Sequence, residues 1–317
     1  MDLLEKKKQE LHDRGITYRI TGIASRRLGW QANATGLSPN EIVVPVPSVP
    51  PVVNAFSEVK KWLEAAQADV LFEATSLDVE HGQPAVDHIR TALEHGAHAI
   101  TANKGPIVQA YGELRDLAAK QNKKFLFEST VMDGVPIFSL FDQLPAVHLH
   151  GFHGILNSTT NVILSHMEQG LTFDESLKKA QELGVAETDA THDIDGWDAA
   201  VKTAALITVL MDVPIRLDQI ARDGIRDLTP QAVRNAKRDG WPFKLVCRAK
   251  RVGNEVRASV APEKVRVSEP MARISGTSSY VYFETDLFPG LAITEENPGL
   301  YATAYGLLAD FIRACRH

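Results

Sequence analysis

The stretch DVLFEATSLDVEHGQPAVDHIRTALEHGAHAITA (residues 69–102) decides the fold class of the first part of the chain. Its ends, DVLFEAT (69–75) and AHAITA (97–102), are short runs of the kind that form buried strands. Between them, PAVDHIRTALEHG (84–96) has helical spacing, and Gly96 is a natural stop. A strand, a helix and a strand in this order predict a parallel pair joined by a right-handed crossover.

The same alternation continues on both sides of this unit. Further strands are expected at ITYRITGIA (16–24) and KFLFEST (124–130), and further helices at residues 56–67 and 106–122. Strands and helices in alternation predict a doubly wound α/β domain, with a parallel sheet that carries helices on both faces. This is the Rossmann-like class of nucleotide-binding domain.

After Val131 the rhythm changes, which predicts a second domain of α+β type. A strand is expected around AVHLHGFHGIL (146–156), followed by several helices and then by strand-like runs suited to an antiparallel or mixed sheet. The helices are expected at 160–170, 173–184 and 196–211, the later strands at 243–252, 255–262 and 279–286, and a closing helix at 301–316. The expected domains are therefore 1–131 together with 298–317, and 132–297.

Composition favours a protein that binds a small molecule. The net charge of −6 comes from interspersed charges of both signs, which argues against a nucleic-acid surface or a polybasic membrane patch. The two cysteines, Cys247 and Cys315, form no CxxC pair, so neither a disulfide framework nor a zinc site is indicated. No apolar run is long enough to span a membrane, and the charged start does not resemble a signal peptide. We expect a cytoplasmic protein.

An acidic segment, AETDATHDIDGWDAAVKTAALI (186–207), places five carboxylates close to a single lysine. Asp198 and Lys202 are spaced i, i+4, so they share a helix face and can pair. A solvated ion pair is the ordinary explanation. The apolar run after Lys202 instead predicts a mostly buried helix, where a lysine is costly unless it is paired or functional. The five carboxylates are Glu187, Asp189, Asp193, Asp195 and Asp198.

A calcium loop is the main alternative for this segment, because DIDG resembles part of the EF-hand pattern. With Gly196 in the glycine position, Lys202 falls where the terminal bidentate acid is required, which argues against calcium. Several carboxylates around one ammonium suit a substrate that carries its own positive charge, such as a zwitterionic amino acid. Lys202 would then exchange a proton or polarise a carbonyl.

Five stretches carry a family resemblance: ITANKGP (100–106), FESTVMDGVPIFSL (127–140), GILNSTTNVIL (154–164), AQELGVAETDATHDIDGWDAAVK (180–202) and ATAYGLLAD (302–310). In their order and spacing they resemble the homoserine dehydrogenases, from about residue 2 onward. The resemblance implies NAD(P)H-dependent interconversion of L-aspartate 4-semialdehyde and L-homoserine, in the branch that leads to threonine and methionine. The alternative is a non-catalytic homologue that keeps the amino-acid pocket and dimer sheet and has lost dinucleotide binding.

The resemblance implies roles for individual residues. Glu187 and Asp193 would bind the substrate ammonium, and Asp198 would hold its hydroxyl end. Lys202 would be the acid/base group, and Lys104 would lie near the nicotinamide and the reacting carbon. An ammonium beside a developing alkoxide can stabilise and protonate it. Further substrate contacts are expected from Asn157, Ser158 and Thr159, although many members have glycine at the position of Ser158.

The family also places a monovalent cation such as Na⁺ near the ESTVMDGV loop. The expected ligands are the Glu128 carboxylate and the backbone carbonyls of Val131, Asp133 and Val135. Met132 and Asp133 stand where many members have glycine. The resemblance further implies a homodimer formed through the sheet of the second domain. No regulatory ACT module of the longer relatives is expected.

Cofactor binding is the least complete feature of the sequence. No G-x-G-x-x-G occurs, although that loop normally presents its backbone N–H groups to the pyrophosphate. At 25–27 the chain reads SRR where an acid would bind a ribose hydroxyl, and two arginines favour a 2′-phosphate, hence NADP over NAD. The expected cofactor contacts are Ser25, Arg26, Arg27, Thr75, Asn103, Lys104 and Gly299.

The first 15 residues, MDLLEKKKQELHDRG, look like the helix that follows the missing loop. The central first strand is then absent as well, which would remove roughly 5–10 kcal/mol of apolar burial from the first domain. We expect an unstable first domain, a substitute element, or a start site assigned too late. As written, the chain is expected to show little turnover.

Overall fold

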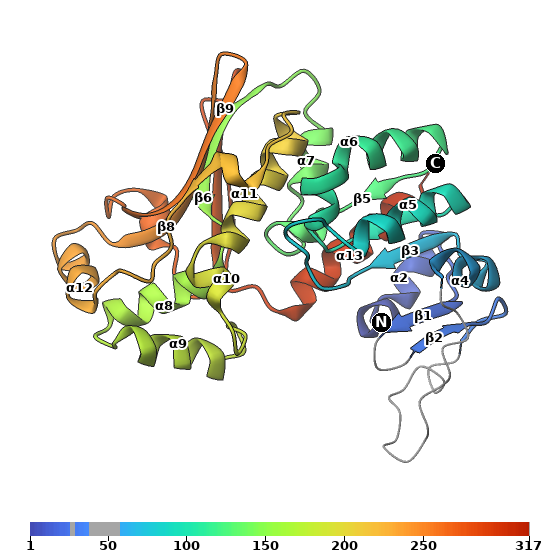
Figure 1. Ribbon diagram of the computed structural model, residues 1–317, viewed down its shortest axis with the longest axis horizontal. Helices are drawn as coiled ribbons and strands as arrows, with labels where there is room; N and C mark the ends of the chain where they lie inside the picture. The colour runs from blue at the N-terminus through green and yellow to red at the C-terminus, as the bar shows by residue number, and fades with distance from the viewer. Residues whose placement is uncertain (26–28, 38–57, 317) are drawn as a thin grey trace. The chain divides into compact units, whose positions relative to one another are not determined.

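The computed structural model describes residues 1–25, 29–37 and 58–316. The chain forms two compact units, the first made of Met1–Ser129 with Ala304–His317 and the second of Thr130–Thr303 (Figure 1). Arg26 and Arg27 lie outside the described residues.

A three-stranded parallel sheet in the order β3-β4-β5 forms the centre of the first unit. α5 (Ala85–His95) connects β3 (Val70–Glu73) to β4 (His98–Thr101). The strand–helix–strand unit predicted at 69–102 is therefore confirmed. α6 (Gly105–Lys120) leads to β5, which covers only Phe125–Leu126 because a 3₁₀ turn follows it at Glu128–Thr130.

Helices cover both faces of this sheet. Ile100 packs in one cluster with Leu11 of α2 and Phe311 of α13. Leu71 packs on the other side with Trp62 of α4. Alternating strand side chains point to opposite faces, so the sheet is doubly wound and the predicted fold class is confirmed. The helices are α1 (Asp2–Lys6), α2 (Lys8–Asp13), α4 (Val59–Ala66) and α13 (Leu300–Ala314).

The strand expected at 16–24 was wrong in extent and pairing. β1 covers only Gly22–Ser25 and pairs antiparallel with β2 (Gly29–Ala32) rather than joining the parallel sheet. Among the described residues β1 and β2 form a two-stranded sheet of their own, separate from the sheet β3-β4-β5, and β2 supplies the hydrogen-bond partners of β1. The Trp62 indole donates to the Gln31 carbonyl at 2.7 Å, which fixes this hairpin to α4.

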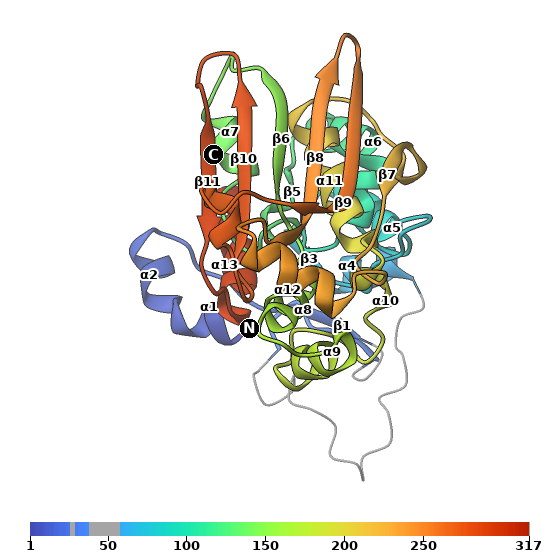
Figure 2. The same ribbon diagram turned by 90° about the vertical axis from the view of Figure 1, so that its left-hand side faces the viewer.

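The second unit contains a mixed six-stranded sheet in the order β11-β10-β6-β8-β9-β7 (Figure 2). Only β7 and β9 are parallel; the other neighbouring strands are antiparallel. The mixed sheet was predicted, but β7 and β11 were not, because they are only three and five residues long. The strands are β6 (Leu149–Ile155), β7 (Ile220–Arg222), β8 (Phe243–Val252), β9 (Glu255–Lys264), β10 (Ser279–Thr285) and β11 (Leu291–Glu295).

Helices α8 and α11 both contact β8, and α7 lies beside α11 (Figure 1). α11 is buried along most of its length, as the apolar run after Lys202 predicted. The short helices α7, α10 and α12 were not predicted. The helices of this unit are α7 (Phe138–Asp142), α8 (Ser158–Glu168), α9 (Phe173–Glu182), α10 (Thr191–Ile194), α11 (Trp197–Leu210) and α12 (Pro230–Arg238).

We expect the substitution Gly154→Ala to destabilise the second unit strongly. A Cβ at residue 154 would lie 2.1 Å from the backbone oxygen of Tyr280 on the neighbouring strand, so β6 and β10 would have to separate. The expected cost is about 3 kcal/mol. Gly112→Ala is the control, because nothing lies within 4 Å of its Cβ and it is in α6, where alanine favours the helix. Urea unfolding measures both; equal midpoints would contradict the prediction.

Candidate active site

Lys202 is held by two oxygen acceptors at the carboxyl end of β6. Its Nζ lies 2.9 Å from Asp198 Oδ2, one turn earlier on α11, and it donates to the Leu156 carbonyl at 2.7 Å. Both charged side chains are 18% exposed. The predicted i, i+4 pair is therefore formed in a largely buried place, and the solvated surface pair is excluded.

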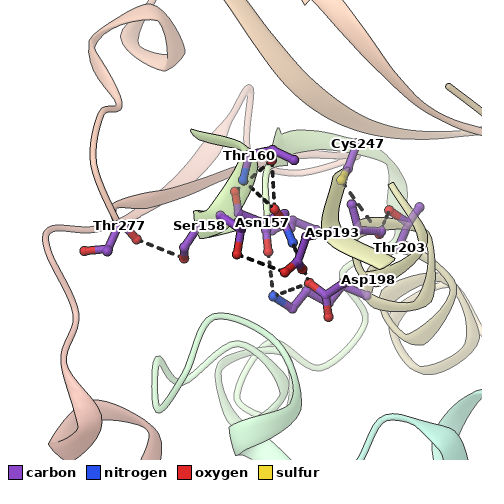
Figure 3. Close-up of polar contacts among 12 residues, drawn as sticks. Asn157, Ser158, Thr160, Asp193, Asp198, Thr203, Cys247 and Thr277 are labelled. Atoms are coloured by element: carbon purple, nitrogen blue, oxygen red, sulfur yellow. Dashed lines mark hydrogen bonds and ion pairs between the residues drawn. The ribbon is translucent and has the colours of Figure 1, made fainter. Parts of the chain in front are cut away.

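Asn157 connects this pair to the acidic segment (Figure 3). Its Oδ1 accepts from the Thr160 backbone N–H at 2.9 Å, which caps the amino end of α8. Its Nδ2 donates to Asp193 Oδ1 at 2.7 Å and to Asp198 Oδ2 at 3.0 Å. Since the oxygen faces N–H and O–H donors and the nitrogen faces carboxylates, the amide orientation is fixed. One side chain therefore positions both carboxylates.

Thr159 completes the arrangement around Asp193. Its hydroxyl lies 3.0 Å from Asp193 Oδ2 and 3.2 Å from the Val185 carbonyl oxygen. Ser158, on the same turn, donates to the Thr277 carbonyl at 3.2 Å. The structure thus brings together the expected substrate residues 157–159 with Asp193, Asp198 and Lys202.

Burial and the neighbouring carboxylates have opposite effects on the pKa of Lys202. Burial favours the neutral amine of Lys202, but the carboxylates of Asp198 and Asp193 outweigh it and raise the pKa of the ammonium. Burial, with the charge of Asp198, also raises the pKa of the Asp193 carboxyl. Lys202 is therefore charged in the folded protein, with its ammonium ready to donate a proton.

Glu187 does not join this cluster in the structure. Its side chain is exposed, and its backbone carbonyl accepts from Gln181 at 3.2 Å. The two acids without an expected role have local contacts. Asp189 accepts from the Thr191 N–H at the start of α10, and Asp195 pairs with Arg226 at 2.9 Å.

The expected cofactor residues of the first unit lie after β3 and β4. Asn103 Nδ2 donates to the Thr75 carbonyl at 3.1 Å, and its Oδ1 accepts from the Gly105 N–H at 2.9 Å. These bonds hold the loops after the two strands together, at the edge of a parallel sheet where α/β proteins bind ligands. Lys104 lies in this turn, immediately before α6. Ser25 ends β1.

The expected cation residues fall in and after the 3₁₀ turn. Glu128 is 2% exposed and lies 3.5 Å from Arg313. Met132 and Asp133 have φ values of +55° and +52°, a backbone region that favours glycine. Glycine adopts this conformation more easily than methionine or aspartate does. The cation itself stays a prediction.

Glu295, at the end of β11, is an acid that the sequence did not single out. Its Oε2 is buried and has no hydrogen-bond partner among the described residues. Burial and the charge of Asp133 raise its pKa to about 7, while Lys202 opposes this shift. In the sequence Glu295 stands only as one of two adjacent acids in TEENPG (294–299). Gly299 follows this strand and precedes α13.

Cys247, on β8, packs against α11, and we expect it to resist alkylation. Its thiol is fully buried against the Ala199 carbonyl, and burial raises its pKa to about 11 (Figure 3). Only the thiolate is nucleophilic. Iodoacetamide at pH near 8 should therefore modify the exposed Cys315 alone, and Cys247 only after unfolding. Peptide mass spectrometry checks this; native labelling of Cys247 would contradict it.

The described part of the chain contains neither a metal-binding cluster nor a membrane-spanning helix. No group of three or more His, Cys, Asp or Glu side chains in that part of the chain is arranged to hold a metal ion. No helix found there is long and apolar enough to cross a membrane.

Comparison with known proteins identifies the family. The profile described as "Homoserine dehydrogenase" matches residues 136–312, and "Homoserine dehydrogenase, NAD binding domain" matches residues 1–128. The "NAD(+)-dependent homoserine dehydrogenase" of Pseudomonas canavaninivorans is 34% identical over 98% of this chain and 90% of its own. The homoserine dehydrogenase of Methanocaldococcus jannaschii is 36% identical over 79% of this chain and 74% of its own. A crystal structure of S. aureus homoserine dehydrogenase has a TM-score of 0.75 at 26% identity, covering 98% of this chain and 71% of that one. This chain belongs to the homoserine dehydrogenase family.

Proposed function

We propose that this chain interconverts L-aspartate 4-semialdehyde and L-homoserine with a nicotinamide dinucleotide. The observation that carries the proposal is the buried Lys202 ammonium, held by Asp198 and the Leu156 carbonyl beside Asp193. A charged donor beside carboxylates suits a substrate that bears both an ammonium and a reducible carbonyl. The relatives described above are named as dehydrogenases, which gives the non-catalytic alternative no support.

Lys202 and Asp198 perform the proton chemistry in this proposal. Reduction of the aldehyde builds negative charge on its oxygen, and Lys202 Nζ donates a proton to that oxygen as the alkoxide forms. The amine left behind takes a proton from solvent. Asp198 orients the ammonium and holds the hydroxyl end of homoserine, while Asp193 receives the substrate ammonium, together with Glu187. Asn157, Ser158 and Thr159 line the substrate side of this arrangement.

The raised pKa of Lys202 predicts how the oxidation of homoserine depends on pH. In that direction Lys202 must accept the hydroxyl proton, so the neutral amine is the active form. Because Asp198 and Asp193 raise its pKa, this form is scarce near neutral pH and increases as the pH rises. We expect kcat for oxidation to climb between pH 7 and pH 10, roughly in proportion to the amine fraction. Initial rates with saturating substrate measure it; a flat profile would contradict the assignment.

The turns after β3 and β4 fit one end of a dinucleotide. Thr75 and Asn103 offer backbone and amide groups at the carboxyl edge of the sheet, and Lys104 supplies a positive charge there. When bound, the dinucleotide supplies or accepts the hydride. Gly299 and Ser25 are further proposed contacts.

We propose that NADP is preferred over NAD, on the strength of Arg26 and Arg27 in the sequence. Guanidinium groups bind a 2′-phosphate, which NAD lacks. The relative from P. canavaninivorans is named as NAD(+)-dependent, so the two cofactors must be compared directly. Arg26→Ser with Arg27→Ser should weaken NADPH binding about tenfold or more and leave NADH binding nearly unchanged.

Two finer features also remain proposals. A monovalent cation such as Na⁺ would be held by Glu128 and the carbonyls of Val131, Asp133 and Val135; turnover measured in sodium, potassium and choline salts tests it. A homodimer through the sheet of the second unit is tested by light scattering.

The function is tested by assaying the purified chain with L-homoserine and either oxidised cofactor, following the absorbance of the reduced nicotinamide. The reverse reaction uses the semialdehyde and the reduced cofactor. D-homoserine is the control, because its ammonium and hydroxyl cannot both take the positions that L-homoserine would occupy beside Asp193 and Lys202. Absence of turnover in both directions with both cofactors would reject the proposal.

A further inference from the structure

Glu295 lies in the same cross-strand row of the sheet as Leu156, whose carbonyl accepts a hydrogen bond from Lys202. On β10, Ser279 pairs with Glu295 of β11, and the next residue, Tyr280, pairs with Ile155 of β6. The row of Ser279 therefore continues to Leu156, whose carbonyl accepts from Lys202. Neighbouring strands are about 4.8 Å apart, so Glu295 is two strand spacings from this carbonyl.

The alternation of side chains puts Glu295 on the same face of the sheet as Lys202. Along β11, Ile293 and Glu295 point to one face, and their partners Val281 and Ser279 point to that face from β10. Phe283 shares this face and contacts Phe141 of α7. Because α7 contacts α11, this is the face that α11 covers. The mutual influence of the Glu295 and Lys202 charges agrees with this placement.

The free acceptor at this place distinguishes Glu295 from the other acids. Both oxygens of Asp193 accept hydrogen bonds, and Asp198 Oδ2 contacts both Asn157 and Lys202. Glu295 Oε2 is buried without a donor among the described residues. A buried acceptor without a donor is costly, and a bound ligand that brings an N–H group removes that cost.

We propose that Glu295 determines substrate specificity by accepting a hydrogen bond from the ammonium group of the amino-acid substrate. The inference rests on the proposed function, because it takes L-homoserine as the ligand. The hydroxyl of homoserine faces Lys202 and Asp198 in the proposed function. Its ammonium has three N–H donors, and two of them suffice for Asp193 and Glu187, so one remains for Glu295. The interaction joins opposite charges in a partly buried place and is therefore one of the stronger kinds of hydrogen bond.

The test is a comparison of Glu295→Gln with Glu296→Gln, the exposed acid that follows it. Binding of L-homoserine is measured by calorimetry with saturating NADPH, since a reduced cofactor cannot take up the hydride of homoserine and no reaction occurs. Glu295→Gln should raise the Kd for L-homoserine about tenfold or more, and Glu296→Gln should leave it within about twofold. Thermal unfolding establishes that both variants are folded.

A second ligand that lacks the amino group separates the contribution of the ammonium from that of the rest of the substrate. With 4-hydroxybutanoate, which lacks the amino group, Glu295→Gln should bind as the unsubstituted protein does. An equal loss for both ligands, or no loss for L-homoserine, would overturn the proposal. A matching loss of NADPH affinity would overturn it too, because Glu295 would then serve the cofactor. Because binding is measured without turnover, an inactive protein that still shows this pattern would reject the proposed function and keep the inference.

Discussion

Replacing Lys202 by methionine is expected to reduce kcat by about 10²- to 10⁴-fold, the usual contribution of a positioned acid/base group. Methionine preserves the length of the side chain and removes the ammonium. Because all the expected cofactor contacts except Gly299 lie in the first unit, the Kd for NADPH should change less than about twofold. Steady-state kinetics and fluorescence titration of NADPH measure the two quantities.

The same substitution should also lower stability, which separates structure from catalysis. Without the ammonium, Asp193 and Asp198 face one another with only Asn157 between them. Breaking a buried ion pair by removing one partner costs about 3–5 kcal/mol, and the 18% exposure of this pair places it near the lower end.

Lys202→Arg is the informative companion variant. It keeps the positive charge and should recover most of the stability, but arginine hardly releases a proton and should leave kcat low. Lys250→Met, at an exposed position on β8, is the control. Turnover by Lys202→Met near that of the unsubstituted chain would remove Lys202 from the mechanism.

The local parts of this site could be predicted from the sequence. The spacing of Asp198 and Lys202 predicts a pair on one helix face, and the apolar run that follows predicts its burial; both are observed. The amino-end cap of α8 at Asn157 is likewise a local property. Such features depend on residues within one or two helical turns, and the spacing of apolar and charged residues in the sequence predicts them.

The contacts that cross the fold could not be predicted. Asn157 reaches Asp193 and Asp198 only because β6 ends beside α11, which depends on the packing of the whole second unit. Glu295 is placed by the register of β10 and β11, which alternation in so short a strand does not specify. The β1–β2 hairpin is a similar case, since the partner of a strand is a non-local property.

The largest effect on stability is expected from Asn157→Asp. Aspartate caps helices as well as asparagine does, so the amino end of α8 keeps its cap and only the donor is lost. The new carboxylate would face Asp193 and Asp198 at the positions where Nδ2 now lies 2.7 and 3.0 Å from their oxygens. We expect a loss of about 3–5 kcal/mol at pH 8, together with weakened binding of homoserine.

The pH dependence identifies the cause of that loss. Crowded carboxylates have a pKa in the folded protein above that in the unfolded chain, so the folded state takes up protons first. The penalty is fully present above the folded pKa and shrinks as the pH falls toward the unfolded value, near 4. As the pH falls from 8 to 5, the free energy of unfolding of Asn157→Asp, measured with urea, should therefore approach that of the unsubstituted chain. Asn157→Ser keeps a cap and adds no charge, so its smaller deficit, about 1–3 kcal/mol, should stay nearly constant with pH. Equal and pH-independent losses in the two variants would show that Asn157 acts through packing alone.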